Sequence, residues 1–174
     1  MIGEKWDVLD ANGKPTGRTT LRGHCNLKNG EYHLVVHIWV VSSDGHVLIQ
    51  KRSDSKKLMP GEWAATGGAA IAGETSFAAA SRELFEELGI SSTPNTLTKL
   101  MRVKRRNSLQ DIWLINNSTP ADELLLQKSE VAEVKWVTID ELLAMIENGE
   151  FHNYGKEYCS RVFPAIKKKS YATI

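Results

Sequence analysis

The sequence predicts an α/β domain, in which helices pack on a β-sheet. Two observations predict this class. Short runs rich in β-branched and aromatic residues recur along the chain, and segments with helical periodicity stand between and after them. The 174 residues, of which 41% are hydrophobic and 25% charged, are enough for one domain with a sizeable core. We therefore expect a single domain over residues 1–174.

The first half of the chain is predicted to be mainly strands. We expect strands at residues 6–10, 32–41 and 47–52. An Asn-Gly turn at 11–14 closes the first strand, and a turn at 42–45 joins the other two as a hairpin. A polar loop follows at 53–60. Thr66-Gly67-Gly68 is interpreted as a glycine-rich approach to a further loop.

The second half alternates helices and strands. Helices are expected at 75–88, 138–146 and 155–168, and strands at 97–104, 111–116 and 134–137. Gly89 stands where a glycine commonly ends a helix. The second helix opens with a capping box formed by Thr138 and Glu141.

Composition excludes several classes of protein. Lys and Arg total 22 and Asp and Glu total 21, so the formal net charge is +1. Nothing in this balance argues for a nucleic-acid or membrane partner, and neither is expected. Cys25 and Cys159 form no CxxC pattern, so we expect reduced thiols rather than a disulfide or zinc framework. The N-terminus lacks the apolar run of a signal peptide, and the longest apolar run, 34–41, is too short to span a bilayer. A cytoplasmic location follows by default.

The predicted helix at 75–88 carries an unusual group of acids. Glu83, Glu86 and Glu87 are spaced i, i+3 and i+4, so they share one face, and Arg82 is the only cation on this helix. Like charges at this spacing weaken a helix by about 0.2–0.5 kcal/mol each. One interpretation is a solvated acidic face. The other is a site for Mg²⁺ or Mn²⁺, because carboxylate oxygens are preferred ligands of these ions and a bound ion relieves the repulsion.

The residues around these acids complete a longer pattern at 68–90. It reads Gly68, five residues, Glu74, seven residues, Arg82-Glu83-Leu84, one residue, Glu86-Glu87, one residue, Gly89-Ile90. This pattern resembles the Nudix box, the defining motif of the Nudix hydrolases. The resemblance implies an α/β/α sandwich with a mixed β-sheet and a loop–helix–loop catalytic motif. It also implies metal-dependent hydrolysis of a phosphoanhydride bond in a nucleoside di- or triphosphate or a related diphosphate compound, with Mg²⁺ or Mn²⁺ as cofactor.

The resemblance also implies roles for individual residues. The metal-binding acids are Glu83, Glu86 and Glu87. Glu83 is in addition a candidate for the base that takes a proton from water, and the backbone carbonyl of Gly67 is a candidate metal ligand. Glu74 and Arg82 are implied to be a pair that fixes the loop against the helix within the catalytic motif. Glu130 is either an extra catalytic acid or an exposed loop carboxylate.

Basic residues after the strand at 47–52 are candidate substrate contacts. Arg52 and Lys51 stand where members of the family often place a basic residue, and a guanidinium suits bidentate contact with phosphate. The alternative is an ordinary basic loop. The expected partner is a small-molecule diphosphate substrate, and homodimers are common in the family.

The order of motifs outside the box resembles the Nudix subgroup related to isopentenyl-diphosphate isomerase. His24 and His33 lie near where two metal-binding histidines of those isomerases would fall, although their spacing is longer here. The catalytic cysteine and third histidine should fall within 64–69, and neither is present. Hydrolysis is therefore the better interpretation, and His24, His33 and His37 are interpreted as structural. An isomerase-like enzyme and a non-catalytic ligand-binding module remain as alternatives.

Overall fold

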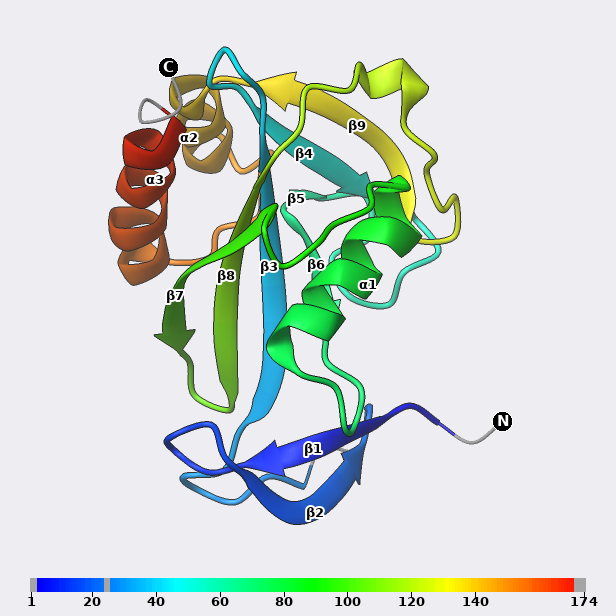
Figure 1. Ribbon diagram of the computed structural model, residues 1–174, viewed down its shortest axis with the longest axis vertical. Helices are drawn as coiled ribbons and strands as arrows, with labels where there is room; N and C mark the ends of the chain where they lie inside the picture. Colours follow the sequence, from blue (N-terminus) through cyan, green and yellow to red (C-terminus); the bar gives the residue numbers. More distant parts are fainter. Residues whose placement is uncertain (1–2, 24–25, 171–174) are drawn as a thin grey trace.

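The computed structural model describes residues 3–23 and 26–170 of the chain. These residues contain a two-stranded antiparallel hairpin, β1–β2, and a sheet of seven strands in the order β5-β4-β3-β8-β7, with β6 beside β3 and β9 beside β4 (Figure 1). Their bounds are Lys5–Leu9 (β1), Pro15–Leu21 (β2), His33–Val41 (β3), Val47–Arg52 (β4), Trp63–Ala64 (β5), Thr66–Ala69 (β6), Leu97–Lys104 (β7), Ser108–Asn116 (β8) and Val131–Val137 (β9). Because β3 and β8 are parallel and the other pairs are antiparallel, the sheet is mixed, as predicted.

Helices cover both faces of this sheet (Figure 1). The helix α1 (Ser76–Leu88) lies on one face, and α2 (Ile139–Glu147) and α3 (Lys156–Ser170) lie on the other, with a short 3₁₀ turn at Ala121–Glu123. Two hydrophobic clusters fill the spaces between the layers: one beneath α1 and one beneath α2 and α3. The predicted α/β/α sandwich is confirmed.

The ends of α1 follow from its sequence. Thr75 is the N-cap, and its side chain accepts a hydrogen bond from the Ala78 N–H at 3.1 Å. Gly89 ends the helix with φ of 70°, a left-handed conformation that glycine adopts without strain. Leu84 and Leu88 are fully buried against the sheet, so the rotation of the helix is set by its apolar stripe. The capping box of α2 also forms as predicted, between Thr138 and Glu141.

Some strands differ from the sequence prediction. Strand β2 was not expected, because its side chains are nearly all exposed and show no apolar alternation. Thr66-Gly67-Gly68 is not an approach to a loop but belongs to β6, in which Gly67 pairs with His37. A Cβ atom at Gly67 would lie 2.1 Å from the Val36 carbonyl oxygen, so only glycine allows this pairing. Both differences arise because contacts with a neighbouring strand stabilise a segment that lacks a strand pattern of its own.

The sheet divides into two branches beside β3. Strand β4 pairs with β3 only at Val41 and Val47, near the turn that joins them. Beyond that point β6 lies beside β3 and pairs with residues 35–38, while β4 pairs with β5 and β9. The C-terminal end of β4 and the middle of β6 therefore border a common space, which α1 covers.

Among residues 3–23 and 26–170, no helix is long and apolar enough to cross a membrane.

Candidate active site

The three acids of α1 differ in how far they reach the solvent. Glu87 is buried, with 3% of its surface exposed, and the Glu83 side chain is 14% exposed. Glu86 is at the surface, with 47% of its side chain exposed. The helical spacing brings Glu83 and Glu87 together at the division of the sheet, whereas Glu86 lies at its outer edge.

Glu87 is held by uncharged donors from the two branches of the sheet. Its Oε2 accepts a hydrogen bond from the Gln50 side-chain amide at 2.8 Å and one from the Gly67 backbone N–H at 3.2 Å. Burial, and next the charge of Glu83, raises the pKa of Glu87 to about 8. The charge of Arg52 acts in the opposite direction but does not offset this rise. The Glu87 carboxylate is therefore buried without a balancing cation in contact.

Glu83 lies against Gly68, the first residue of the sequence pattern. A Cβ atom at Gly68 would come within 2.3 Å of Glu83 Oε1, so the missing side chain leaves room for the carboxylate. Burial raises the pKa of Glu83, the neighbouring charges of Glu86 and Glu130 add to this effect, and Arg82 opposes it. Two carboxylates, at positions 83 and 87, thus share a poorly hydrated space.

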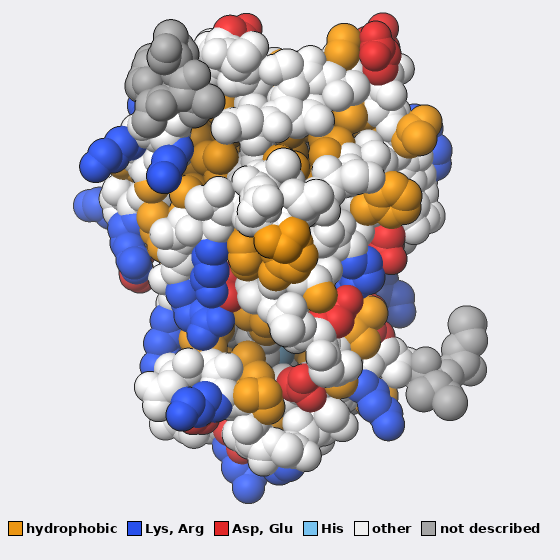
Figure 2. Space-filling model, viewed as in Figure 1, with side chains coloured by type: hydrophobic (Ala, Val, Ile, Leu, Met, Phe, Trp, Pro, Cys, Tyr) orange, Lys and Arg blue, Asp and Glu red, His pale blue; other side chains and the backbone are white. Residues whose placement is uncertain are grey.

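Arg82 joins the loop before α1 to the helix, as the sequence pattern implied. Its Nε lies 2.7 Å from Glu74 Oε1 and its Nη2 lies 3.0 Å from Glu74 Oε2, which is a bidentate ion pair. Glu74 also accepts the Ile71 N–H at 2.8 Å. The remaining nitrogen of Arg82 donates to Glu83 at 2.9 Å and to Glu86 at 3.1 Å. In the space-filling view, acidic and basic side chains lie next to one another on the face that carries α1 (Figure 2).

The two candidate substrate contacts, Arg52 and Lys51, lie on opposite sides of β4. The charge of Arg52 lowers the pKa of Glu87, and the Arg52 Nε donates to the Leu58 carbonyl oxygen at 3.1 Å. Side chains alternate along β4, so Lys51 leaves the strand on the side opposite to Gln50. The structure therefore brings Arg52 toward the acids and does not bring Lys51 there.

Glu130 lies at the margin of the same region. Its charge contributes to the raised pKa of Glu83, and its carboxylate forms an ion pair with Lys56. The Glu130 carbonyl oxygen also accepts the Ser53 N–H at 2.8 Å. The loop after β4 is thus tied to the loop before β9 through Glu130.

The acids have the chemistry of a site for a hard divalent cation, although their carboxylates do not all point to one place. Within the described residues, no three His, Cys, Asp or Glu side chains form a group that could hold a metal ion, and the Glu86 carboxylate is bonded to Arg82. Glu83 and Glu87 nevertheless supply carboxylate oxygens in a buried space, in which Arg82 contacts Glu83 but no cation contacts Glu87. Oxygen donors of this kind suit Mg²⁺ or Mn²⁺ rather than a softer metal. The residues that would hold such an ion are Glu83 and Glu87, with Glu86 after release from Arg82, and the backbone of Gly67.

The histidines have structural partners where they are described. The His33 ring stacks on Trp6, with ring centroids 4.4 Å apart, and burial lowers its pKa to about 4. The His37 Nδ1 lies 3.0 Å from the Tyr158 hydroxyl on the α3 side of the sheet. His24 and Cys25 lie outside the described residues.

Two polar side chains beside the acids were not singled out from the sequence. Gln50 is 1% exposed. The feature of the sequence that could have identified it is a polar residue directly after the apolar run of β4. The Tyr154 hydroxyl, also buried, accepts the Ala65 N–H at 3.1 Å. Burial is the main cause that raises the Tyr154 pKa, and the charges of Glu87 and Arg52 also affect it. Tyr154 follows α2 in an irregular segment, so no pattern in the sequence marks it.

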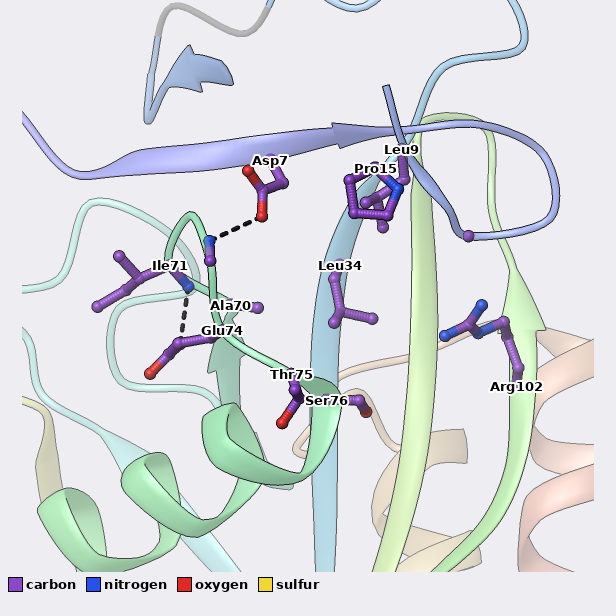
Figure 3. Close-up of a pocket in the computed structure, with 12 residues that line it drawn as sticks. Asp7, Leu9, Pro15, Leu34, Ala70, Ile71, Glu74, Thr75, Ser76 and Arg102 are labelled. Atoms are coloured by element: carbon purple, nitrogen blue, oxygen red, sulfur yellow. Dashed lines mark hydrogen bonds between the residues drawn. The ribbon is translucent and has the colours of Figure 1, made fainter. Parts of the chain in front are cut away.

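A pocket of about 330 Å³ lies at the opposite end of α1 from these acids (Figure 3). Its walls come from the β1–β2 hairpin, the loop before α1, and β3 and β7. The Asp7 carboxylate accepts the Gly73 N–H at 2.7 Å, and this bond joins the hairpin to the loop. The pocket therefore borders the loop that contains Glu74 but does not contain Glu83 or Glu87.

The sequence matches the family model described as NUDIX domain over residues 31–155, which is more than half of the chain. The chain belongs to the Nudix family. An uncharacterized Nudix hydrolase of Listeria monocytogenes is 40% identical over 152 residues, which span 87% of this chain and 89% of the relative. The nucleoside triphosphatase NudI of Salmonella agona is 32% identical over 113 residues, or 59% of this chain and 80% of the relative.

A solved structure has the same fold. DR0079 from Deinococcus radiodurans aligns with a TM-score of 0.75 at 22% identity, covering 97% of this chain and 99% of the other. The protein is thus an enzyme of the Nudix hydrolase family, whose members generally hydrolyse phosphoanhydride bonds of small molecules with the help of divalent metal ions.

Proposed function

We propose that this Nudix hydrolase cleaves a phosphoanhydride bond in a nucleoside di- or triphosphate, or in a related diphosphate compound, with Mg²⁺ or Mn²⁺. The observation that carries the proposal is the buried carboxylate pair Glu83 and Glu87, which lacks a balancing cation in contact with Glu87. NudI, a relative named as a nucleoside triphosphatase, supports the nucleotide class.

Each residue of the site has a chemical task in this proposal. Glu83 and Glu87 hold the cation, with Glu86 and the Gly67 carbonyl as further ligands. When bound, the cation would supply screening of the phosphate charges and a lower pKa for the attacking water. Glu83, whose side chain is partly open to solvent, accepts a proton from that water.

The basic residues have supporting tasks. The Arg82–Glu74 ion pair holds the loop so that Glu83 stays over Gly68. Arg52, which lies toward the acids, binds a phosphate group of the substrate. Lys51 contributes at most a longer-range charge, because it leaves β4 on the other side.

Product release from a panel of compounds tests this function. The panel holds nucleoside triphosphates, nucleoside diphosphates, diphosphate sugars and prenyl diphosphates, each with Mg²⁺, with Mn²⁺ and with a chelator. We expect release that requires metal and that Glu83→Gln removes, while Glu147→Gln, a change of the same kind at the far end of α2, leaves it intact. Binding of a panel compound without turnover would instead favour a ligand-binding module.

We also propose that the chain belongs to the subgroup related to isopentenyl-diphosphate isomerase but does not isomerise. Residues 64–66, which end β5 and begin β6 beside Glu87, are Ala64, Ala65 and Thr66. This stretch therefore offers neither the thiol nor the imidazole that would move protons on an alkene. Incubation with isopentenyl diphosphate should yield no rearranged product. Appearance of the isomer would contradict this assignment.

We propose one catalytic unit spanning residues 1–174, a cytoplasmic location and assembly as a homodimer. Light scattering after size-exclusion chromatography should give twice the monomer mass of 19.4 kDa. A monomer mass at all concentrations would contradict the dimer and leave the site unaffected.

A further inference from the structure

We propose that Gln50 is a positioning residue that orients the Glu87 carboxylate and thereby sets the affinity of the site for its divalent cation. This inference rests on the proposed function, since it concerns the same metal site.

The hydrogen bonds of Glu87 show how its orientation is fixed. Its Oε2 receives both donors, the Gln50 Nε2 at 2.8 Å and the Gly67 N–H at 3.2 Å. Two donors on one oxygen restrict rotation of the carboxylate and leave its Oε1 for a further ligand. The donors come from β4 and β6, the two branches of the sheet, so they approach from elements that are themselves fixed by strand pairing.

The bonding of Gln50 itself indicates that its amide N–H is what the site requires. The side chain is 1% exposed, and its Oε1 is buried without a hydrogen-bond partner among the described residues. A buried polar atom without a partner is unfavourable, and an apolar side chain of similar size would avoid this cost. The compensating contact is the 2.8 Å bond to Glu87, with a longer one of 3.5 Å to the Ala65 carbonyl oxygen.

The absence of a charge on Gln50 also matters. A lysine or arginine at this position would orient Glu87 too, but it would neutralise the carboxylate and compete with a metal ion. An uncharged donor orients Glu87 and leaves its charge available. Residues that orient a metal ligand in this way commonly change metal affinity by about 10–100-fold when they are removed.

A structural role alone would have a different signature. If Gln50 only joins α1 to β4, its loss would lower thermal stability and leave metal affinity unchanged. Gln110 supplies a matched control, because it lies in β8 of the same sheet, has an equally unpartnered Oε1 and borders a polar surface formed with Lys104 and Asn107 rather than the acids.

The experiment is a Mn²⁺ titration of the full chain, followed by calorimetry or by the electron paramagnetic resonance signal of free Mn²⁺. We expect Gln50→Met to weaken Mn²⁺ binding by about 10–100-fold and Gln110→Met to bind as the wild type does. Thermal unfolding in chelator checks that each variant is folded. If Gln50→Met does not fold, Gln50→Asn keeps a buried amide that is one carbon too short to reach Glu87, and the same weakening is expected.

Two results would overturn the inference, and they are distinguishable. Mn²⁺ binding by a folded Gln50 variant within about twofold of wild type, well below the expected change, refutes the role of Gln50 and leaves the proposed function standing. Absence of Mn²⁺ binding by the wild type itself refutes the metal site, and with it both proposals.

Discussion

Two buried carboxylates, Asp111 in β8 and Glu87 in α1, lie in opposite electrostatic surroundings. Asp111 is fully buried, and it accepts hydrogen bonds from Lys99 at 2.5 Å and from Arg102 at 2.6 and 2.8 Å. Burial by itself raises the pKa of Asp111, but the bonds from Arg102 and Lys99 outweigh it and the pKa is lowered. Glu87 is almost as buried, and its donors are a side-chain amide and a backbone N–H.

The difference separates a carboxylate that stabilises the fold from one that is available for a ligand. Two cations balance Asp111, so its charge is satisfied within the chain. Glu87 faces the second carboxylate of Glu83, and its pKa is raised to about 8. Burial alone therefore does not mark an acid as a candidate for function, whereas burial without a balancing cation does.

Replacing Glu87 with Gln should have the largest effect. The amide oxygen can accept both existing hydrogen bonds, so the fold is kept, but a charged metal ligand is lost. We expect kcat/KM to fall by about 100-fold or more, measured on the best substrate of the panel at saturating metal. Turnover close to wild type would remove Glu87 from the metal site.

Replacing Asp111 with Asn should affect stability instead of activity. Lys99 and Arg102 would lose their counter-charge, at a cost of about 2–3 kcal/mol, which is below the cost for fully buried pairs because both cations reach water. The melting temperature should fall by about 4–12 °C, as calorimetry would show. The Mn²⁺ affinity of Asp111→Asn should equal that of the wild type. A loss of Mn²⁺ affinity would contradict a purely structural role for Asp111.

The pH dependence of stability should differ in sign between the two acids. The folded pKa of Glu87 lies above its unfolded value of 4.5, so its contribution is present below that value and is lost as the pH rises through about 8. For Asp111 the folded pKa is lowered, so its contribution is present above 3.8 and is lost as the pH falls below it. In chelator, the unfolding free energy of Glu87→Gln relative to wild type should increase by about 4 kcal/mol between about pH 5 and pH 9, because only the wild type loses this contribution. If the melting temperatures of wild type and Glu87→Gln differ by the same amount at both pH values, Glu87 is not a buried group that binds a proton.

Arg82→Lys should give the smallest of these effects. Lysine keeps the positive charge but cannot make the two-bond contact with Glu74 while also reaching Glu83. We expect a loss of about 1 kcal/mol in unfolding free energy and a modest fall in activity, because the loop before α1 becomes less ordered. Denaturant titration measures the unfolding free energy. A loss as large as that of Asp111→Asn would contradict this ranking and show that Arg82 contributes more to stability than one ion pair at the surface.

The local elements were predictable where the sequence pattern is strong. The helix α1, its Thr75 cap and its Gly89 terminus follow from apolar periodicity and capping chemistry, and the capping box of α2 was identified in the same way. Strands β2 and β5 were not predictable, because β2 is nearly all exposed and β5 has only two residues. Both depend on pairing with a strand already present.

The sequence by itself determined the family, through the spacing of Gly68, Glu74, Arg82 and the acids, because that spacing is a property of the chain. It also predicted that Glu83 and Glu87 would share one side of a helix. Only the tertiary structure decided that Glu87 is buried between Gln50 and Gly67, that Arg82 turns Glu86 outward, and that Arg52 rather than Lys51 lies toward the acids. These features depend on where β4, β6 and α1 meet, and the free energy of a buried charge is set by such neighbours rather than by sequence spacing.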